Sequence, residues 1–156
     1  GPGEVPGQYR NVIPNFVYWS MLEKSLPLTG TGDETRDFTY VLDLVQGLIK
    51  AGYYEDAIGQ AFNLASGKET KIKDMISMVN NATGNATPIT EFPPRKWDTK
   101  KRLLASIDLA GKLIDYKPII SFDEGLKSNF DWFKTNWEKI QKAADFPIGM
   151  SSAVRK

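Results

Sequence analysis

Apolar residues recur at helical spacing in three stretches of this chain, over 12–22, 42–51 and 122–140. Each stretch places its apolar side chains three or four residues apart, so that one face of a helix would be apolar and the other polar. The last pattern is the strongest, since four large side chains follow at spacings of four, three and four: Leu126, Phe130, Phe133 and Trp137. Three amphipathic helices are therefore predicted, and the last is expected to run unbroken from Phe122 to about Ile140.

Short runs rich in β-branched and aromatic residues lie between these helices and predict strands. Residues 26–29 and 35–41 flank a glycine turn, which fits two short strands. Residues 61–65 are interpreted as a buried strand closed by a Ser-Gly pair, and 87–92 as a further strand.

Two shorter helices complete the pattern. Thr70 can cap a helix whose apolar residues continue to Val79 and which ends in an Asn-rich cluster around Gly84. Ser106 is expected to cap a short helix through Leu113. Gly52 is expected just past the end of the 42–51 helix. Strands that alternate with helices predict the α/β class, and the chain has no internal repeat.

Composition limits the chemistry open to this protein. A chain of 156 residues, 41% of them hydrophobic, is ordinary for one globular domain. The formal charge of +1 gives no overall field to recruit nucleic acid or an anionic membrane. The absence of Cys and His removes thiolate nucleophiles, the commonest general base and the commonest metal ligands. No metal site is therefore predicted. The chain also has no long apolar run and no secretion signal, which predicts a cytoplasmic protein.

The candidate binding residues are two arginines and one aspartate. Arg36 stands in an otherwise apolar strand, and Arg95 lies three residues before Asp98 in a proline-rich loop. A guanidinium presents a rigid fork of donors that matches the oxygens of a phosphate, which makes both arginines anion-site candidates. The alternative is a partly buried arginine that pairs with Asp37 or Asp98 and holds a loop, and such pairs are common in folded domains.

Two further polar or aromatic residues have alternative roles. Asn11 can cap the first helix or direct its amide at a ligand, and capping is the commoner role at that position. Trp97 can stack on a base or sugar ring or pack against the body of the domain, and packing is the commoner role.

Together these residues resemble the second half of the extended short-chain dehydrogenases, the NAD-dependent nucleotide-sugar epimerases and dehydratases of the UDP-glucose 4-epimerase type. Residues 1–3 look like the remainder of the family's Tyr-Gly-Pro motif, and 11–14 like its Asn-x-x-Pro helix start. Residues 35–43 resemble its most recognisable C-terminal signature. Residues 62–69 are similar to its Tyr-Asn-Ile-Gly-Ser-Gly stretch, and 95–98 match its Arg-x-x-Asp loop.

The resemblance implies a role for each of these positions in holding a UDP-sugar or related nucleotide sugar. Asn11 would contact the diphosphate, and the strand around Leu28 would lie along the uracil. Arg36 and Arg95 would bind the diphosphate, and Asp98 would lie near ribose or sugar hydroxyls. The implied substrate-binding residues are Asn11, Pro27, Leu28, Thr29, Arg36, Arg95 and Asp98.

Two family motifs are missing from this sequence. It has no Gly-x-x-Gly-x-x-Gly turn for the dinucleotide, and none of its six tyrosines begins a Tyr-x-x-x-Lys pair. The resemblance thus implies the C-terminal substrate-binding part of a Rossmann-type enzyme, over 1–145 with a frayed tail at 146–156. In that enzyme NAD, held by the missing N-terminal cofactor domain, transiently oxidises the sugar at C4. This chain alone is expected to carry no catalytic residue and to be inactive.

Two other interpretations stay open. The chain can be a non-catalytic nucleotide-sugar binding or scaffold domain, or the catalytic half can exist as a separate polypeptide. In the family the strand at 62–65 joins the sheet of the cofactor domain, so this part alone is expected to self-associate through exposed edges and apolar faces.

Overall fold

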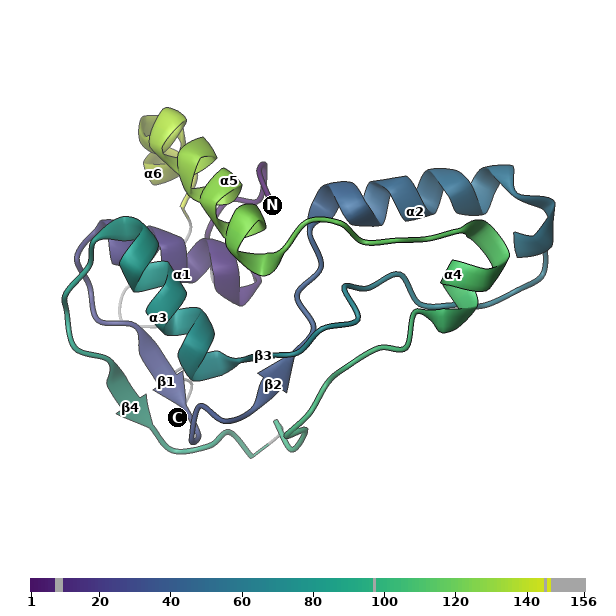
Figure 1. Ribbon diagram of the computed structural model, residues 1–156. Coiled ribbons are helices and arrows are strands. Elements are labelled where there is room, and N and C mark those ends of the chain that lie inside the picture. The colour runs from purple at the N-terminus through teal and green to yellow at the C-terminus, as the bar shows by residue number, and fades with distance from the viewer. Residues whose placement is uncertain (8–9, 97, 145, 147–156) are drawn as a thin grey trace.

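The computed structural model describes residues 1–7, 10–96, 98–144 and 146. Short strands and helices follow one another along the chain, which confirms the α/β class (Figure 1). The elements are α1 Val12–Met21, β1 Pro27–Thr29, β2 Thr35–Arg36, α2 Val41–Tyr53, η1 Glu55–Ala57, β3 Thr70–Lys71, α3 Ile72–Thr83, β4 Thr90–Phe92, α4 Asp108–Ile114, α5 Phe122–Thr135 and α6 Trp137–Ala143.

The molecule has two ends of different construction (Figure 1). Helices α1, α3, α5 and α6 gather at one end beside β1 and β4, and we call this end the body. Helices α2 and α4 lie together at the other end, which we call the arm. The apolar core of the body comes from all four of its helices, with Val17, Met75, Phe133 and Ile140 at most 1% exposed. A smaller cluster in the arm centres on Tyr116.

Two small sheets hold the strands. β1 pairs in parallel with β4, and β2 pairs antiparallel with β3, where Arg36 lies opposite Thr70. The segment 101–103 runs beside β2, because the N–H of Thr35 donates to Lys101 and the N–H of Leu103 donates to the carbonyl of Thr35. The predicted strands at 26–29, 35–41 and 87–92 are therefore confirmed, in shorter form.

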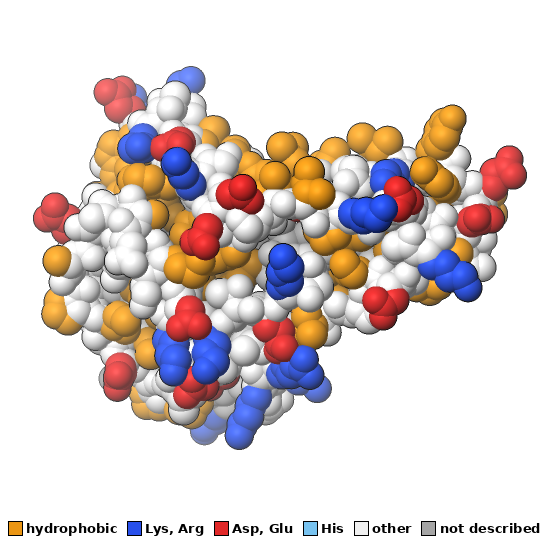
Figure 2. Space-filling model, in the orientation of Figure 1, with side chains coloured by type: hydrophobic (Ala, Val, Ile, Leu, Met, Phe, Trp, Pro, Cys, Tyr) orange, Lys and Arg blue, Asp and Glu red, His pale blue; other side chains and the backbone are white. Residues whose placement is uncertain are grey.

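Helix α2 runs further than its sequence predicts. It continues through Gly52 and ends at Tyr53, so Gly52 is not its C-terminal stop. Near its start the buried carboxylate of Asp43 accepts the backbone N–H groups of Ile119 and Ile120 at 3.1 and 3.0 Å. Apolar side chains are exposed along this helix (Figure 2): Leu42, Val45, Leu48, Ile49 and Tyr53.

The prediction of a buried strand over 61–65 is wrong. Only Ala65 is buried, and this segment has no ladder partner among the described residues. A strand is defined by its pairing, and an apolar run of this kind pairs where a neighbouring parallel strand exists. Here the segment packs instead against the arm, where the hydroxyl of Tyr116 donates to the carbonyl of Ala65.

One predicted helix cap is wrong. Thr70 lies in β3, and α3 begins after Lys71 without a side-chain cap. Ser106 stands one residue before the N-cap position of α4, and its hydroxyl accepts the N–H of Asp108, the first helical residue, at 3.4 Å. The end of α3 is as predicted, because Gly84 adopts a left-handed conformation at φ 77° that glycine takes without strain.

The unbroken helix predicted from Phe122 to Ile140 is interrupted at Asn136. The backbone of Asn136 leaves the helical region, and the side-chain amide of Asn136 donates to the carbonyl of Trp132 at 2.9 Å. Helix α6 therefore turns back on the body, where Trp137 packs against Tyr18. Of the predicted frayed tail, Phe146 is described and packs against Tyr18 and Trp19, and 147–156 lie outside the described residues. In the described ranges, we find no helix with the length and apolar character to cross a bilayer.

Candidate functional site

A cleft of about 340 Å³ lies where β1, the end of β2 and the loop after β4 meet α1. Its lining combines apolar side chains of α1 and Phe38 with charged side chains. Five of the seven residues singled out from the sequence line it: Pro27, Thr29, Arg36, Arg95 and Asp98. They come from two stretches, 27–36 and 95–98, which lie about 60 positions apart in sequence and which the fold brings together.

Strand β1 presents alternate residues to the cleft. Pro27 and Thr29 line it, whereas the side chain of Leu28 is buried at 7% exposure in the body core. Leu26 and Gly30 bond to β4 through their backbones, at Thr90 and Phe92. Because backbone groups also alternate along a strand, the N–H and C=O of Thr29 point to the edge away from β4. That edge is available to a ligand in the cleft.

Arg36 is held by acceptors within the protein. One terminal nitrogen donates to the carbonyls of Thr35 and Lys100, at 2.8 and 3.1 Å. The other donates to both carboxylate oxygens of Asp98, at 3.0 and 3.2 Å. The side chain of Arg36 is 20% exposed and that of Asp98 43%. In this state the arginine pairs with Asp98 and holds the 95–100 loop against β2, which is one of the two pairings that the sequence left open.

The other pairing, with Asp37, does not form. The carboxylate of Asp37 turns to two other segments and accepts the backbone N–H groups of Ser66, Gly67 and Ala105, together with the Ser66 hydroxyl. Arg36 and Asp37 are adjacent in sequence, and successive side chains of an extended strand point to opposite faces. Their neighbouring charges therefore serve different parts of the fold.

Arg95 brings an unpaired donor to the cleft. It is half-buried, and its Nε is buried without a hydrogen-bond partner among the described residues. A buried guanidinium donor that lacks an acceptor costs free energy, on the order of 1–3 kcal/mol or more. Arg95 lines the cleft, so an anionic group there would supply an acceptor if the guanidinium turned towards it. Trp97, two residues further on, lies outside the described residues.

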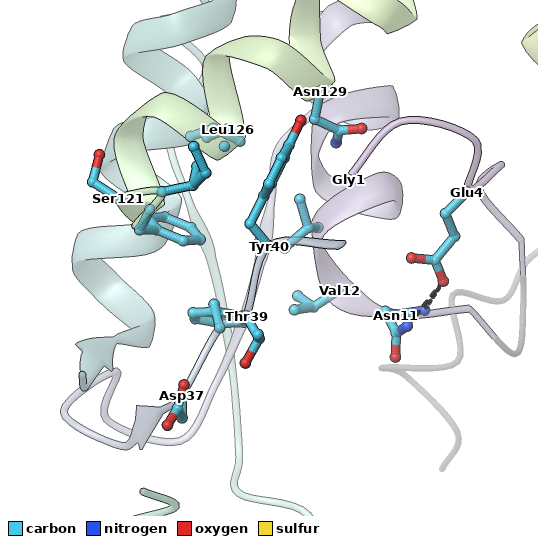
Figure 3. Close-up of a pocket in the computed structure, with 15 residues that line it drawn as sticks. Gly1, Glu4, Asn11, Val12, Asp37, Thr39, Tyr40, Ser121, Leu126 and Asn129 are labelled. Carbon is cyan, nitrogen blue, oxygen red and sulfur yellow. Dashed lines mark hydrogen bonds between the residues drawn. The ribbon is translucent and has the colours of Figure 1, made fainter. Parts of the chain in front are cut away.

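Asn11 lies in a neighbouring pocket of about 240 Å³ rather than in the cleft (Figure 3). It occupies the N-cap position of α1 but makes no capping bond, and its amide donates instead to Glu4 at 2.9 Å. The expected capping bond is thus absent. The pocket and the cleft share Val12, Asp37 and Phe38, so Asn11 lies on the far side of a thin wall.

A second ion pair, between Arg102 and Glu69, lies next to β2 and outside the cleft. Arg102 donates two hydrogen bonds to Glu69, at 2.8 and 2.7 Å, and the hydroxyl of Thr35 donates to the same carboxylate. The Arg102 and Thr35 hydrogen bonds lower the pKa of Glu69 to about 2. Sequence reasoning missed this pair and the role of Asp37. No local pattern marks either of them, because their partners lie about 30 or more residues away.

The comparisons with known proteins agree with this geometry. The model of the NAD dependent epimerase/dehydratase family matches residues 1–65, the part that includes Asn11, β1 and Arg36. This part of the chain belongs to this family. The chain is 33% identical over 134 residues to a UDP-glucuronate 4-epimerase from Thermodesulfobacterium geofontis, a match that covers 83% of this chain and 39% of that protein.

Solved structures of this family have the same fold. An epimerase from Methanothermobacter thermautotrophicus is 53% identical with a TM-score of 0.92, over 94% of this chain and 44% of that one. The enzyme WbmF from Bordetella bronchiseptica, in complex with NAD+ and UDP, is 35% identical with a TM-score of 0.78, over 91% of this chain and 45% of that one. The chain therefore spans less than half the length of the family members it matches.

Proposed function

We propose that this chain is the substrate-binding part of an NAD-dependent epimerase, dehydratase or decarboxylase of nucleotide sugars, and that its cleft holds the diphosphate of a UDP-sugar. The observation that carries the proposal is the pair of arginines in one cleft beside the outer edge of β1, with the Nε of Arg95 lacking an acceptor among the described residues. The complex of WbmF with UDP and that of a Bacillus cereus UDP-glucuronic acid 4-epimerase with UDP-glucuronic acid support this ligand class.

The arginines would grip the diphosphate through charge-assisted hydrogen bonds. Arg95 lines the cleft, and its Nε has no acceptor among the described residues. On Arg36 a phosphate oxygen would replace the carboxylate of Asp98, and that carboxylate would then accept hydrogen bonds from ribose or sugar hydroxyls. The edge of β1 at Thr29 would bind the base through its backbone groups. Asn11 would reach the diphosphate from the neighbouring pocket, which shares lining residues with the cleft.

The chain itself does not fit NAD. It has no glycine-rich turn between a strand and a helix, which is the element that cradles the dinucleotide phosphates. We therefore place the cofactor and the catalytic residues of the proposed enzyme outside this chain. The contribution of this part is to fix the sugar carbon in position, which is a large share of catalysis when two reactants must meet.

Calorimetric titration with UDP tests the proposal, with Arg36→Ala and Arg95→Ala compared against the unmodified chain. Each change is expected to remove a charged contact worth about 1.5–3 kcal/mol, a weakening of ten- to a hundredfold or more. Arg102→Ala is the matched control, because Arg102 also pairs with a carboxylate but does not line the cleft.

Three results would count against the proposal as stated. A folded chain that binds no UDP would mean that this part does not form the site alone. Equal losses in all three variants would mean that the arginines shape the loop rather than contact the ligand. Unchanged binding in both cleft variants would place the UDP site elsewhere.

A further inference from the structure

Asp37 lies at the meeting point of three segments. Its Oδ1 accepts the backbone N–H of Ser66 at 2.9 Å and also the Ser66 hydroxyl. Its Oδ2 accepts the N–H of Gly67 at 3.1 Å and that of Ala105 at 3.4 Å. Four donors from two loops thus converge on one carboxylate directly after β2. Hydrogen bonds to a charged acceptor are about twice as strong as neutral ones, so this junction is rigid.

The same junction sets the position of Arg36. The backbone of Arg36 is fixed on one side by its pairing with β3 and on the other by the 101–103 segment, which bonds to Thr35. Asp37 holds both flanking segments where they leave this small sheet, at Ser66 before β3 and at Ala105 after 101–103. A shift of either segment would displace Arg36 relative to Arg95, which also lines the cleft.

A carboxylate that lines an anion site would ordinarily oppose binding. Asp37 lines the cleft, yet both of its oxygens already accept hydrogen bonds from the protein. Those donors offset its charge towards the cleft. We infer that Asp37 is a positioning residue, which aims the Arg36 guanidinium at the diphosphate and does not contact the ligand. This inference rests on the proposed function for the identity of that ligand.

Asp37→Asn tests the inference, with Asp43→Asn as its matched control. Both aspartates accept backbone N–H groups from a distant loop, but Asp43 does so in the arm. In either variant one oxygen becomes an amide donor that faces N–H groups. At similar losses in melting temperature, Asp37→Asn is expected to weaken UDP binding about tenfold or more, whereas Asp43→Asn leaves it unchanged. Unchanged or tighter binding in Asp37→Asn would overturn the inference.

A double variant separates positioning from general damage. If Asp37 acts through Arg36, Asp37→Asn should have little further effect on UDP binding once Arg36 is alanine. Additive losses in Arg36→Ala/Asp37→Asn would overturn the inference. If Asp37→Asn does not fold, Ser66→Ala removes only the hydroxyl donor and should weaken binding in the same direction, by a smaller factor. No weakening in Ser66→Ala would then count against the role of Asp37.

Amide hydrogen exchange keeps this test separate from the proposed function. The N–H of Leu103, which donates to Thr35 across the junction, should exchange faster in Asp37→Asn and not in Asp43→Asn. If the unmodified chain binds no UDP, the proposed function fails, and faster exchange at Leu103 would still support a junction held by Asp37. Unchanged exchange at Leu103 would overturn it.

Discussion

The body and the arm are both built on amphipathic helices, but only the body covers their apolar faces. In the body α1, α3, α5 and α6 bury one another, and Phe133 is fully enclosed. In the arm α2 exposes Leu48 at 57% and Ile49 at 68%. The same three-to-four-residue pattern therefore leads to a buried face in one region and an exposed face in the other. A helical pattern therefore indicates that one face of a helix is apolar. It does not indicate whether another element of the chain covers that face.

The largest expected effect is in the body core. Phe133→Ala should lower the free energy of unfolding by about 3–5 kcal/mol, because it removes a fully buried ring and leaves a cavity. Urea unfolding followed by circular dichroism measures this loss. A loss below about 1 kcal/mol would mean that the body is loosely packed and that the contrast with the arm is false.

Two glycines of α2 sharpen the comparison within the arm. A Cβ at Gly47 would lie 2.7 Å from Leu64 and 2.9 Å from the ring of Tyr116, whereas a Cβ at Gly52 would meet nothing within 4 Å. Gly47→Ala should destabilise by about 1–3 kcal/mol through overpacking. Gly52→Ala should stabilise by up to about 1 kcal/mol through helix propensity. Thermal unfolding of both variants checks the prediction, and equal shifts would show that the inner face of α2 is not packed.

The outer face of α2 is expected to affect association more than stability. The chain should self-associate, and the double change Leu48→Lys/Ile49→Lys should reduce this while changing the unfolding free energy by only about 0.5 kcal/mol. Analytical ultracentrifugation of both proteins measures it. If the unmodified chain sediments as a stable monomer, the prediction of self-association is wrong. If the double variant loses much of its free energy of unfolding, this face of α2 is buried rather than exposed.

The smallest expected effect concerns the ion pair between Glu69 and Arg102. The folded pKa of Glu69 lies near 2, below the ordinary 4.5, so its stabilisation is present above pH 4.5 and is lost as the pH falls towards 2. The melting-temperature difference between the unmodified chain and Glu69→Gln should therefore shrink over that range. The pair is exposed, so the difference should be small, and a pH-independent gap would contradict the assigned pKa.

Local sequence patterns predicted much of the body and part of the site. The start of α1, the end of α3 at Gly84 and the strand at Pro27–Thr29 depend on neighbours within a few residues, and all three were predictable. The break at Asn136 was not, since the apolar spacing continues across it to Trp137. There the tertiary gain from folding α6 back on α1 prevails over a continuous helix.

Sequence by itself determined which residues were candidates for an anion site, because the types and spacing of Arg36, Arg95 and Asp98 are local properties. Only the tertiary structure decided which acidic neighbour Arg36 takes, and it placed Asp98 there while turning Asp37 to Ser66 and Ala105. Within the part of the chain that the structure describes, it likewise left 61–65 without a strand partner and the outer face of α2 exposed. The physical reason is that pairing depends on distance in space, and these partners lie up to 68 positions apart along the chain.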